Sequence, residues 1–296
     1  MSYVPDSTTS IRFKAQSENQ PEQDKIEESF GYTQKSEYPK SFLSKDMFGN
    51  YINSNHQLSN VSDEQQKFLE IAKKENITEA HARIKTYAEK WKDVPEYKWT
   101  IGDIVKWKTT GGDDYIHKEK IGFIKNYKDV ILDAAEKYNI PPVLLAGVAY
   151  VEYGGDPMWI DDIAYAVRSF DWSGPKWVDE NLTITKNPDF TSFGNTSIQV
   201  RRALEMLGYD ASSASRKAVI DSLKDPIQNI YLTACHLNIL QNVDYKGKKP
   251  ADLTDDEIKV IASRYNLGPD IPLNDVETGY GERIYNNKDD ILKALS

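Results

Sequence analysis

The sequence predicts a mainly α-helical protein with a long irregular or β-hairpin loop and a partly flexible N-terminal segment. Apolar residues recur at helical spacing through much of the chain after residue 62. One run, at 141–155, begins with prolines and ends with glycines, as helices often do, and its apolar residues indicate that the helix is buried. Residues 156–195 show neither pattern and are rich in Gly, Pro, Asn and Asp, which indicates a long functional loop.

Length, charge and cysteine content limit the possible functions. The 296 residues suffice for one or two domains, and a net charge of −9 gives no electrostatic reason to bind nucleic acid or anionic membranes. Residues 1–14 contain no apolar run, so we expect no secretory signal, and no stretch reaches the roughly 18 apolar residues of a membrane span. Cys235 is the single cysteine, so we expect cytosolic synthesis and folding without disulfides.

No cofactor is expected from the motifs. The four histidines (His56, His81, His117 and His236) have no metal-ligand spacing. The sequence also contains no Gly-rich phosphate loop and no Gly-x-Ser-x-Gly nucleophile elbow. These absences disfavour metal, phosphate-transfer and serine-hydrolase chemistry.

The first part of the chain differs in composition from the rest. Residues 1–60 are rich in Ser, Gln, Glu, Asn, Lys and Pro, and such a segment buries too little apolar surface to offset its ordering entropy. We expect a flexible or loosely docked segment. The alternative is an arm docked on the body through Phe42, Phe48 and Tyr51.

Two further regions follow this segment. Residues 61–115 predict a small helical and irregular region, with one helix or two between Asp63 and Trp91 and a break near Asn76. We place a domain boundary at about residue 115, after the poorly patterned stretch 97–114. Residues 116–296 then predict a single helical domain. Its helices are expected at Ile121–Tyr138, Pro141–Gly155, Ser197–Leu207, Ser213–Leu223, Pro226–Leu240 and Asp255–Tyr265.

The helix at 141–155 carries one charged residue, Glu152, in its last turn. The seven apolar residues before it, interrupted only by Gly147, indicate a helix that is buried on all sides. Burial and the negative end of the helix dipole both penalise an ionised carboxyl. Glu152 can therefore hold a proton near neutral pH and act as a general acid. The alternative is a glutamate at a helix end that points into water.

Four stretches in this order resemble the goose-type lysozymes and lytic transglycosylases of glycoside hydrolase family 23, which have the lysozyme-like fold. Glu152-Tyr153-Gly154-Gly155 resembles the Glu-x-Gly-Gly that carries the catalytic acid of that family, with Tyr153 where a Ser is usual. The stretches that follow it are SFGNTSIQV (192–200), DPIQNIYLTACHLNIL (225–240) and IASRYNLGPD (261–270). ETGYGERI (277–284) then resembles the Thr…Tyr ending typical of the transglycosylases. In the second stretch Thr196 stands where a Gly is usual.

The resemblance implies a muramidase, which cleaves the β-1,4 bond between N-acetylmuramic acid and N-acetylglucosamine in peptidoglycan. It implies Glu152 as the general acid, Tyr265 and Asn266 beside it, and Gln199 and Ser192 along the substrate groove. An inverting hydrolase also needs a second carboxylate that activates water. The candidates, all in the loop after the acid, are Asp156, Asp161, Asp162 and Asp171. A lytic transglycosylase needs none, because the 6-hydroxyl of the sugar attacks and leaves a 1,6-anhydro end.

Two classes of function remain open at this point. The first is a peptidoglycan-cleaving enzyme, delivered to the periplasm of a target bacterium as an antibacterial type VI secretion effector, or released as a phage endolysin. An effector implies glycan strands, a secretion component and a cognate immunity protein as partners. The second is an inactive lysozyme-like binding or structural module, which the departures at Tyr153 and Thr196 favour. Turnover of purified cell walls discriminates the two.

Overall fold

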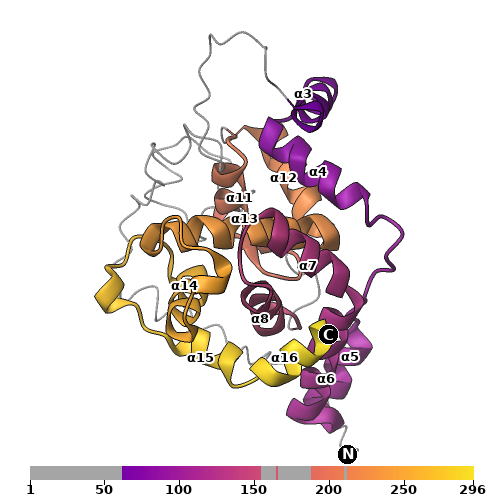
Figure 1. The fold of residues 1–296 in the computed structure, drawn as a ribbon. Helices are drawn as coiled ribbons and strands as arrows, with labels where there is room; N and C mark the ends of the chain where they lie inside the picture. The colour runs from indigo at the N-terminus through magenta and orange to yellow at the C-terminus, as the bar shows by residue number, and fades with distance from the viewer. Residues whose placement is uncertain (1–61, 155–164, 166–187, 210–211) are drawn as a thin grey trace, which may run out of the picture. The chain divides into compact units, whose positions relative to one another are not determined.

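The computed structural model describes residues 62–154, 165, 188–209 and 212–296, all of which belong to one compact unit (Figure 1). This part of the chain is mainly helical, as the sequence predicts, and contains two short strands. Predictions for residues 1–60 and for most of the loop after Glu152 lie outside the described residues.

The first two described helices confirm the predicted break near Asn76. Helix α3 (Asp63–Glu75) begins at the capping box of Ser62, and helix α4 (Glu79–Glu89) begins at Thr78, whose side chain accepts a hydrogen bond from the His81 N–H. Asn76 ends α3 in the left-handed conformation with φ of 52°. Asparagine tolerates this conformation better than most residues, which explains why the chain turns there.

The stretch 97–114, which has no clear pattern in the sequence, is helical from Ile101 onward. Helix α5 (Ile101–Lys106) starts at a capping box formed by Thr100 and Asp103, continues as a π-helical turn (Trp107–Gly111) and leads into helix α6 (Gly112–Asn126). The capping box was the local signal for this start, and the six-residue helix is too short to show periodicity. Residue 115, where the sequence suggests a boundary, lies inside α6.

The single helix predicted at Ile121–Tyr138 is two helices. Tyr127, with φ of −105° and ψ of 18°, ends α6 and precedes helix α7 (Lys128–Lys137). Its side chain is buried, and its hydroxyl accepts a hydrogen bond from the Tyr97 N–H at 3.1 Å. The apolar stripe stays on one side across the break, which is why the sequence pattern did not reveal it.

The second half of the unit contains the hairpin and the remaining helices. A short 3-10 turn (Pro188–Phe190) precedes strands β1 (Ser192–Phe193) and β2 (Ile198–Gln199), which pair antiparallel with Ser192 opposite Gln199. The helices that follow are α11 (Val200–Met206), α12 (Ser213–Lys224), α13 (Pro226–Asp244), α14 (Asp255–Leu267), α15 (Gly279–Tyr285) and α16 (Lys288–Leu295). The predicted helices beginning at residues 213, 226 and 255 are confirmed, whereas the one predicted from 197 begins after the β2 strand. None of the described helices, the 19 residues of α13 included, is both long and apolar enough to cross a membrane.

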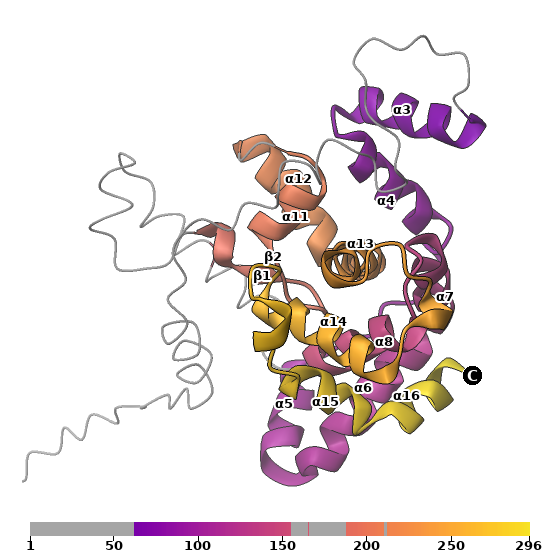
Figure 2. The same ribbon diagram turned by 60° about the vertical axis from the view of Figure 1, so that its left-hand side comes forward.

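Helix α8 (Pro142–Glu152) lies at the centre of these helices (Figures 1 and 2). It contacts α6, α7, α13, α14, α15 and α16, and its residues from Leu144 to Tyr150 are buried. The buried helix predicted at 141–155 is thus confirmed as the helix at the core of the unit.

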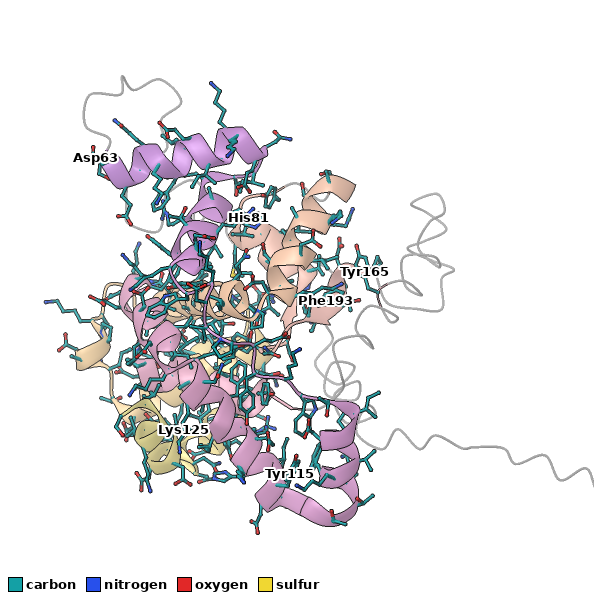
Figure 3. The ribbon with its side chains drawn as sticks, turned by 90° about the vertical axis from the view of Figure 1, so that its right-hand side faces the viewer. Asp63, His81, Tyr115, Lys125, Tyr165 and Phe193 are labelled. Carbon is teal, nitrogen blue, oxygen red and sulfur yellow. The ribbon has the colours of Figure 1, made fainter. Side chains whose placement is uncertain are left out.

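The α3–α4 pair packs on the α12–α13 side of the unit. His81, labelled in Figure 3, is buried where α4 meets α12. Its Nδ1 is 2.7 Å from the Tyr209 hydroxyl, and its Nε2 is 2.6 Å from the Ser222 hydroxyl. Burial lowers the pKa of His81 to about 4, so the imidazole is neutral at pH 7. This histidine is a satisfied core residue that ties α4 to α12.

Candidate active site

Glu152 is the last residue of α8 and is half-buried. Tyr153 leaves the helix in an extended conformation, and Gly154 follows in the left-handed region with φ of 85°. The apolar helix therefore delivers one carboxyl group to the edge of the core. This is the environment that the sequence predicts for Glu152.

Two glycines let helices α14 and α15 approach this region. A Cβ atom on Gly147 of α8 would lie 2.3 Å from Cγ2 of Ile284, and one on Gly281 of α15 would lie 2.4 Å from the Lys259 carbonyl oxygen. Real Cβ atoms do not come so close to other heavy atoms, so the α15 backbone packs where any larger residue would displace it. The Gly281 N–H also donates to the Ser263 hydroxyl at 3.0 Å. This packing fixes the helix that contains Tyr280.

Tyr280 donates its hydroxyl proton to Oε1 of Glu152 at 2.7 Å. Its side chain is buried, and burial raises its pKa well above the usual value, so it stays a proton donor in this bond. The sequence contains Tyr280 in the Thr…Tyr ending, but its place beside the acid is a structural finding.

Burial raises the pKa of the Glu152 carboxyl above its ordinary value. The hydrogen bonds from Tyr280 and Ser197 and the positive charges of Lys120 and Arg283 lower it, but they offset the burial only in part. A carboxyl that is easier to protonate than usual, and whose ionised form still has donors around it, can both give up and take back a proton.

The β1–β2 hairpin brings Ser197 to Glu152. Ser197 has a positive φ of 55°, which is uncommon for a residue with a side chain, and its N–H bonds to the Gly194 carbonyl at 3.1 Å. The turn is pinned to α13 through Thr196, which is fully buried. The N–H and the hydroxyl of Thr196 donate to Oδ1 of Asn229, at 3.1 and 2.7 Å.

Thr196 thus has a definite structural role at the position where the resembled motif has a glycine. Its hydroxyl also lies 2.6 Å from that of Thr233, and its carbonyl accepts a hydrogen bond from the Tyr265 hydroxyl at 2.6 Å. The position that needs glycine is Gly194, where a Cβ atom would lie 2.2 Å from the Leu223 carbonyl oxygen. The departure at Thr196 therefore leaves the hairpin intact.

Tyr265 joins the hairpin to the Tyr280 side of the site. It is half-buried, its hydroxyl holds the Thr196 carbonyl, and its ring centroid lies 6.4 Å from that of Tyr280. The Tyr265 hydroxyl donates to the hairpin, and the Tyr280 hydroxyl donates to Glu152. Asn266, predicted beside the acid, is exposed.

The turn after Tyr265 is fixed by Arg264, which the sequence did not single out. Its guanidinium is buried and forms an ion pair with Asp244 of α13, with Nη2 2.8 Å from Oδ1. Its Nη1 donates to the carbonyls of Gly268 and Pro269, at 3.3 and 3.1 Å. The Tyr-Asn-x-Gly-Pro stretch is therefore anchored from inside the core.

The other predicted site residues lie in the hairpin or outside the described residues. Ser192 and Gln199 are opposite each other in the hairpin and half-buried, and the Gln199 side-chain oxygen accepts a hydrogen bond from Nε of Arg201 at 2.8 Å. The loop candidates for a second carboxylate all lie outside the described residues: Asp156, Asp161, Asp162 and Asp171. Tyr165, which belongs to the same loop and is described, has its ring centroid 5.7 Å from that of Phe193 (Figure 3).

Tyr153 faces the core and not the acid. Its buried ring stacks on Phe123 with 4.3 Å between centroids, and Tyr97 and Trp99 pack against it with their edges. Tyrosine in place of the usual serine therefore binds the segment before α5 to the core.

No protein-family model matches the chain, and searches of curated proteins and of solved structures give no significant match. Among the described residues, no three His, Cys, Asp or Glu side chains lie together so that they could hold a metal ion. The functional interpretation therefore depends on the motifs and on the geometry around Glu152.

Proposed function

We propose that this chain is a peptidoglycan-cleaving muramidase with Glu152 as its general acid. The observation that carries the proposal is the half-buried Glu152 carboxyl at the end of α8, whose raised pKa is due to burial and whose Oε1 accepts a hydrogen bond from Tyr280. Glycosidic cleavage requires an acid of this kind to protonate the departing sugar oxygen. The four motifs, which resemble those of glycoside hydrolase family 23, support the same substrate class.

The proposed reaction uses Glu152 twice. Its carboxyl proton passes to the bridging oxygen as the bond from C1 of N-acetylmuramic acid breaks, which releases a sugar with a free hydroxyl. The carboxylate that remains accepts hydrogen bonds from Tyr280 and Ser197. It then takes the proton of the nucleophile that attacks C1, so that Glu152 ends protonated as it began.

We propose that the nucleophile is the 6-hydroxyl of the same sugar, which makes the enzyme a lytic transglycosylase. Tyr280 belongs to the Thr…Tyr ending typical of the transglycosylases and bonds directly to the acid, which supports this route. The competing route is hydrolysis, with water activated by Asp161, Asp162 or Asp171.

Turnover of purified peptidoglycan by the full chain tests the proposal. Glu152→Gln keeps the shape of the side chain but removes the acidic proton, so cleavage should fall by a factor of about 10² to 10⁴. The matched control is Glu136→Gln, the same change at an exposed glutamate near the end of α7, which should retain activity. Undiminished cleavage by folded Glu152→Gln protein would refute the role of Glu152, and no cleavage by the unmodified chain would favour the binding module.

The biological setting that we propose is an antibacterial effector of the type VI secretion class, with a cognate immunity protein and a secretion component as partners. Its substrate lies outside the cytoplasm. Expression in the bacterial cytosol should be harmless, whereas the same chain with an added export signal should lyse the cell, and Glu152→Gln should abolish lysis. Killing from the cytosol would contradict this setting, since no wall substrate is present there. A phage endolysin would show the same chemistry with a holin in place of a secretion component.

A further inference from the structure

The end of α8 has a cationic partner that neither the motifs nor the proposed reaction include. Lys120 of α6 donates from Nζ to the carbonyl oxygen of Val151 at 2.9 Å, one residue before Glu152. Its ammonium also lies 5.3 Å from the centroid of the Tyr150 ring. The side chain is half-buried, so it reaches the end of α8 through the α6–α8 packing.

Gly154 makes room for this approach. A Cβ atom at Gly154 would lie 2.5 Å from Cδ1 of Ile116 and 3.9 Å from Cε of Lys120, and the backbone there has a φ of 85°. Glycine adopts this positive φ without strain and has no Cβ that would collide with Ile116. Gly154 therefore lets Ile116 of α6 pack close to the end of α8, and Lys120 lies one turn further along the same helix.

The cations and hydrogen-bond donors that act on the Glu152 carboxyl come from three elements. Lys120 belongs to α6, Tyr280 and Arg283 to α15, and Ser197 to the hairpin. On the α16 side, Nε2 of His117 lies 3.3 Å from Oδ2 of Asp290, and Nδ1 of the same ring meets the Tyr150 hydroxyl at 2.7 Å. Of the two cations that act on Glu152, Lys120 is half-buried and hydrogen-bonded to α8, whereas Arg283 is exposed.

Lys120 and Glu152 influence each other's titration. Burial lowers the pKa of Lys120 to about 8, the negative charge of Glu152 raises it, and the nearby Arg283 lowers it. A lysine near this value keeps its proton while Glu152 is ionised. The carbonyls at a helix C-terminus also favour a cation, so the hydrogen bond from Lys120 to the Val151 carbonyl stabilises both the charged lysine and the end of α8.

We infer that Lys120 is a positioning residue for Glu152, which fixes the last turn of α8 and supplies the charge that stabilises the carboxylate after proton donation. The inference rests on the proposed function for its catalytic meaning. The Lys120–Glu152 coupling itself is a property of the protein without substrate. It can therefore be measured whether or not the chain cleaves wall.

The test is a titration of the purified full chain, with ¹³C-labelled Glu carboxyls observed by NMR and Glu152 assigned with Glu152→Gln. Lys120→Met removes the charge and keeps most of the unbranched side chain, and should raise the Glu152 pKa by about 1, the lower end of the effect of a nearby opposite charge. Lys120→Arg should keep the pKa near that of the unmodified chain. The matched control, Lys118→Met, removes an exposed lysine from the same helix and should leave the Glu152 pKa unchanged.

The reverse measurement keeps the inference testable if Lys120→Met does not fold. Coupling between two sites is reciprocal, so Glu152→Gln should lower the Lys120 pKa, followed by the ¹³Cε signal of labelled lysine. An unchanged Glu152 pKa in folded Lys120→Met, an equal shift in Lys118→Met, or an unchanged Lys120 pKa in Glu152→Gln would each overturn the inference. These readouts use no wall, so absence of wall cleavage would count against the proposed function alone.

Discussion

The hydrogen bond between Tyr280 and Glu152 gives a sharp prediction for Tyr280→Phe. The substitution removes one hydroxyl and leaves the buried ring, with its neighbours Tyr265 and Arg283, in place. The lost bond is 2.7 Å long and is stronger when Glu152 is ionised, because the acceptor then carries a charge. Hydrogen bonds to charged groups contribute about 1.5–3 kcal/mol.

Glu152 is half-buried, so we take the lower end of that range. That lower end, about 1.5 kcal/mol, corresponds to a rise of about 1 in the Glu152 pKa. The same loss in the step that generates the carboxylate slows cleavage about tenfold. The alkaline limb of the pH–rate profile should therefore move to higher pH by about 1, because Glu152 keeps its proton longer.

The assay is the initial rate of clearing of a suspension of purified wall from pH 4 to pH 9. Tyr285→Phe is the matched control: it lies on the same helix, and its hydroxyl donates to Asp255 at 3.0 Å, away from the acid. Tyr285→Phe should have the rate and profile of the unmodified chain. A folded Tyr280→Phe variant with an unshifted profile and full rate would refute the account of this hydrogen bond.

Three further predictions concern the scaffold that holds the site. Gly281→Ala should lower the free energy of unfolding by about 1–3 kcal/mol and reduce activity, because the added Cβ would lie 2.4 Å from the Lys259 carbonyl oxygen. Gly279→Ala, whose Cβ would meet nothing within 4 Å, should change neither stability nor activity. Equal urea midpoints for the two variants would contradict this prediction. Asp244→Asn leaves the buried Arg264 guanidinium without its ion-pair partner and should cost about 3–5 kcal/mol, whereas Asp256→Asn, 92 % exposed, should cost almost nothing in the same urea titration. Burial lowers the pKa of His81 from 6.5 to about 4, so the unfolded chain binds the proton first as pH falls; stability is complete above pH 6.5 and should decline by about 3 kcal/mol towards pH 4. His81→Gln should flatten this decline, and an identical pH dependence in both proteins would exclude His81 as its source.

Helices with a long apolar pattern were predictable from the sequence. The α8 run between prolines and glycines gave the core helix and the position of Glu152 at its end. The break at Tyr127 was not predictable from periodicity, because Ile124 and Ile131 stay on the buried side of both helices. Helix α5 was missed because its six residues are exposed or half-buried and contain no full apolar stripe.

The composition of the site was only partly predictable, because the groups that tune Glu152 come from distant segments. Tyr280 is 128 residues from Glu152 in sequence, and its approach depends on Gly147 and Gly281, whose role appears only when the helices pack. Lys120 lies in an ordinary amphipathic helix, where a lysine predicts nothing beyond a solvated face. The role of Glu152 could therefore be predicted from its neighbours in the sequence, whereas the residues that contact it could be identified only from the fold.

The masses of the fragments that the chain releases from purified peptidoglycan test the central claim most directly. The account predicts muropeptides that end in 1,6-anhydro-N-acetylmuramic acid, each lighter by one water than the hydrolysis product, from the unmodified chain and none from Glu152→Gln. Reducing ends would replace transglycosylation by hydrolysis. Release of the same fragments by the unmodified chain and by folded Glu152→Gln protein, or by neither, would contradict the claim that Glu152 is the acid of a wall-cleaving enzyme.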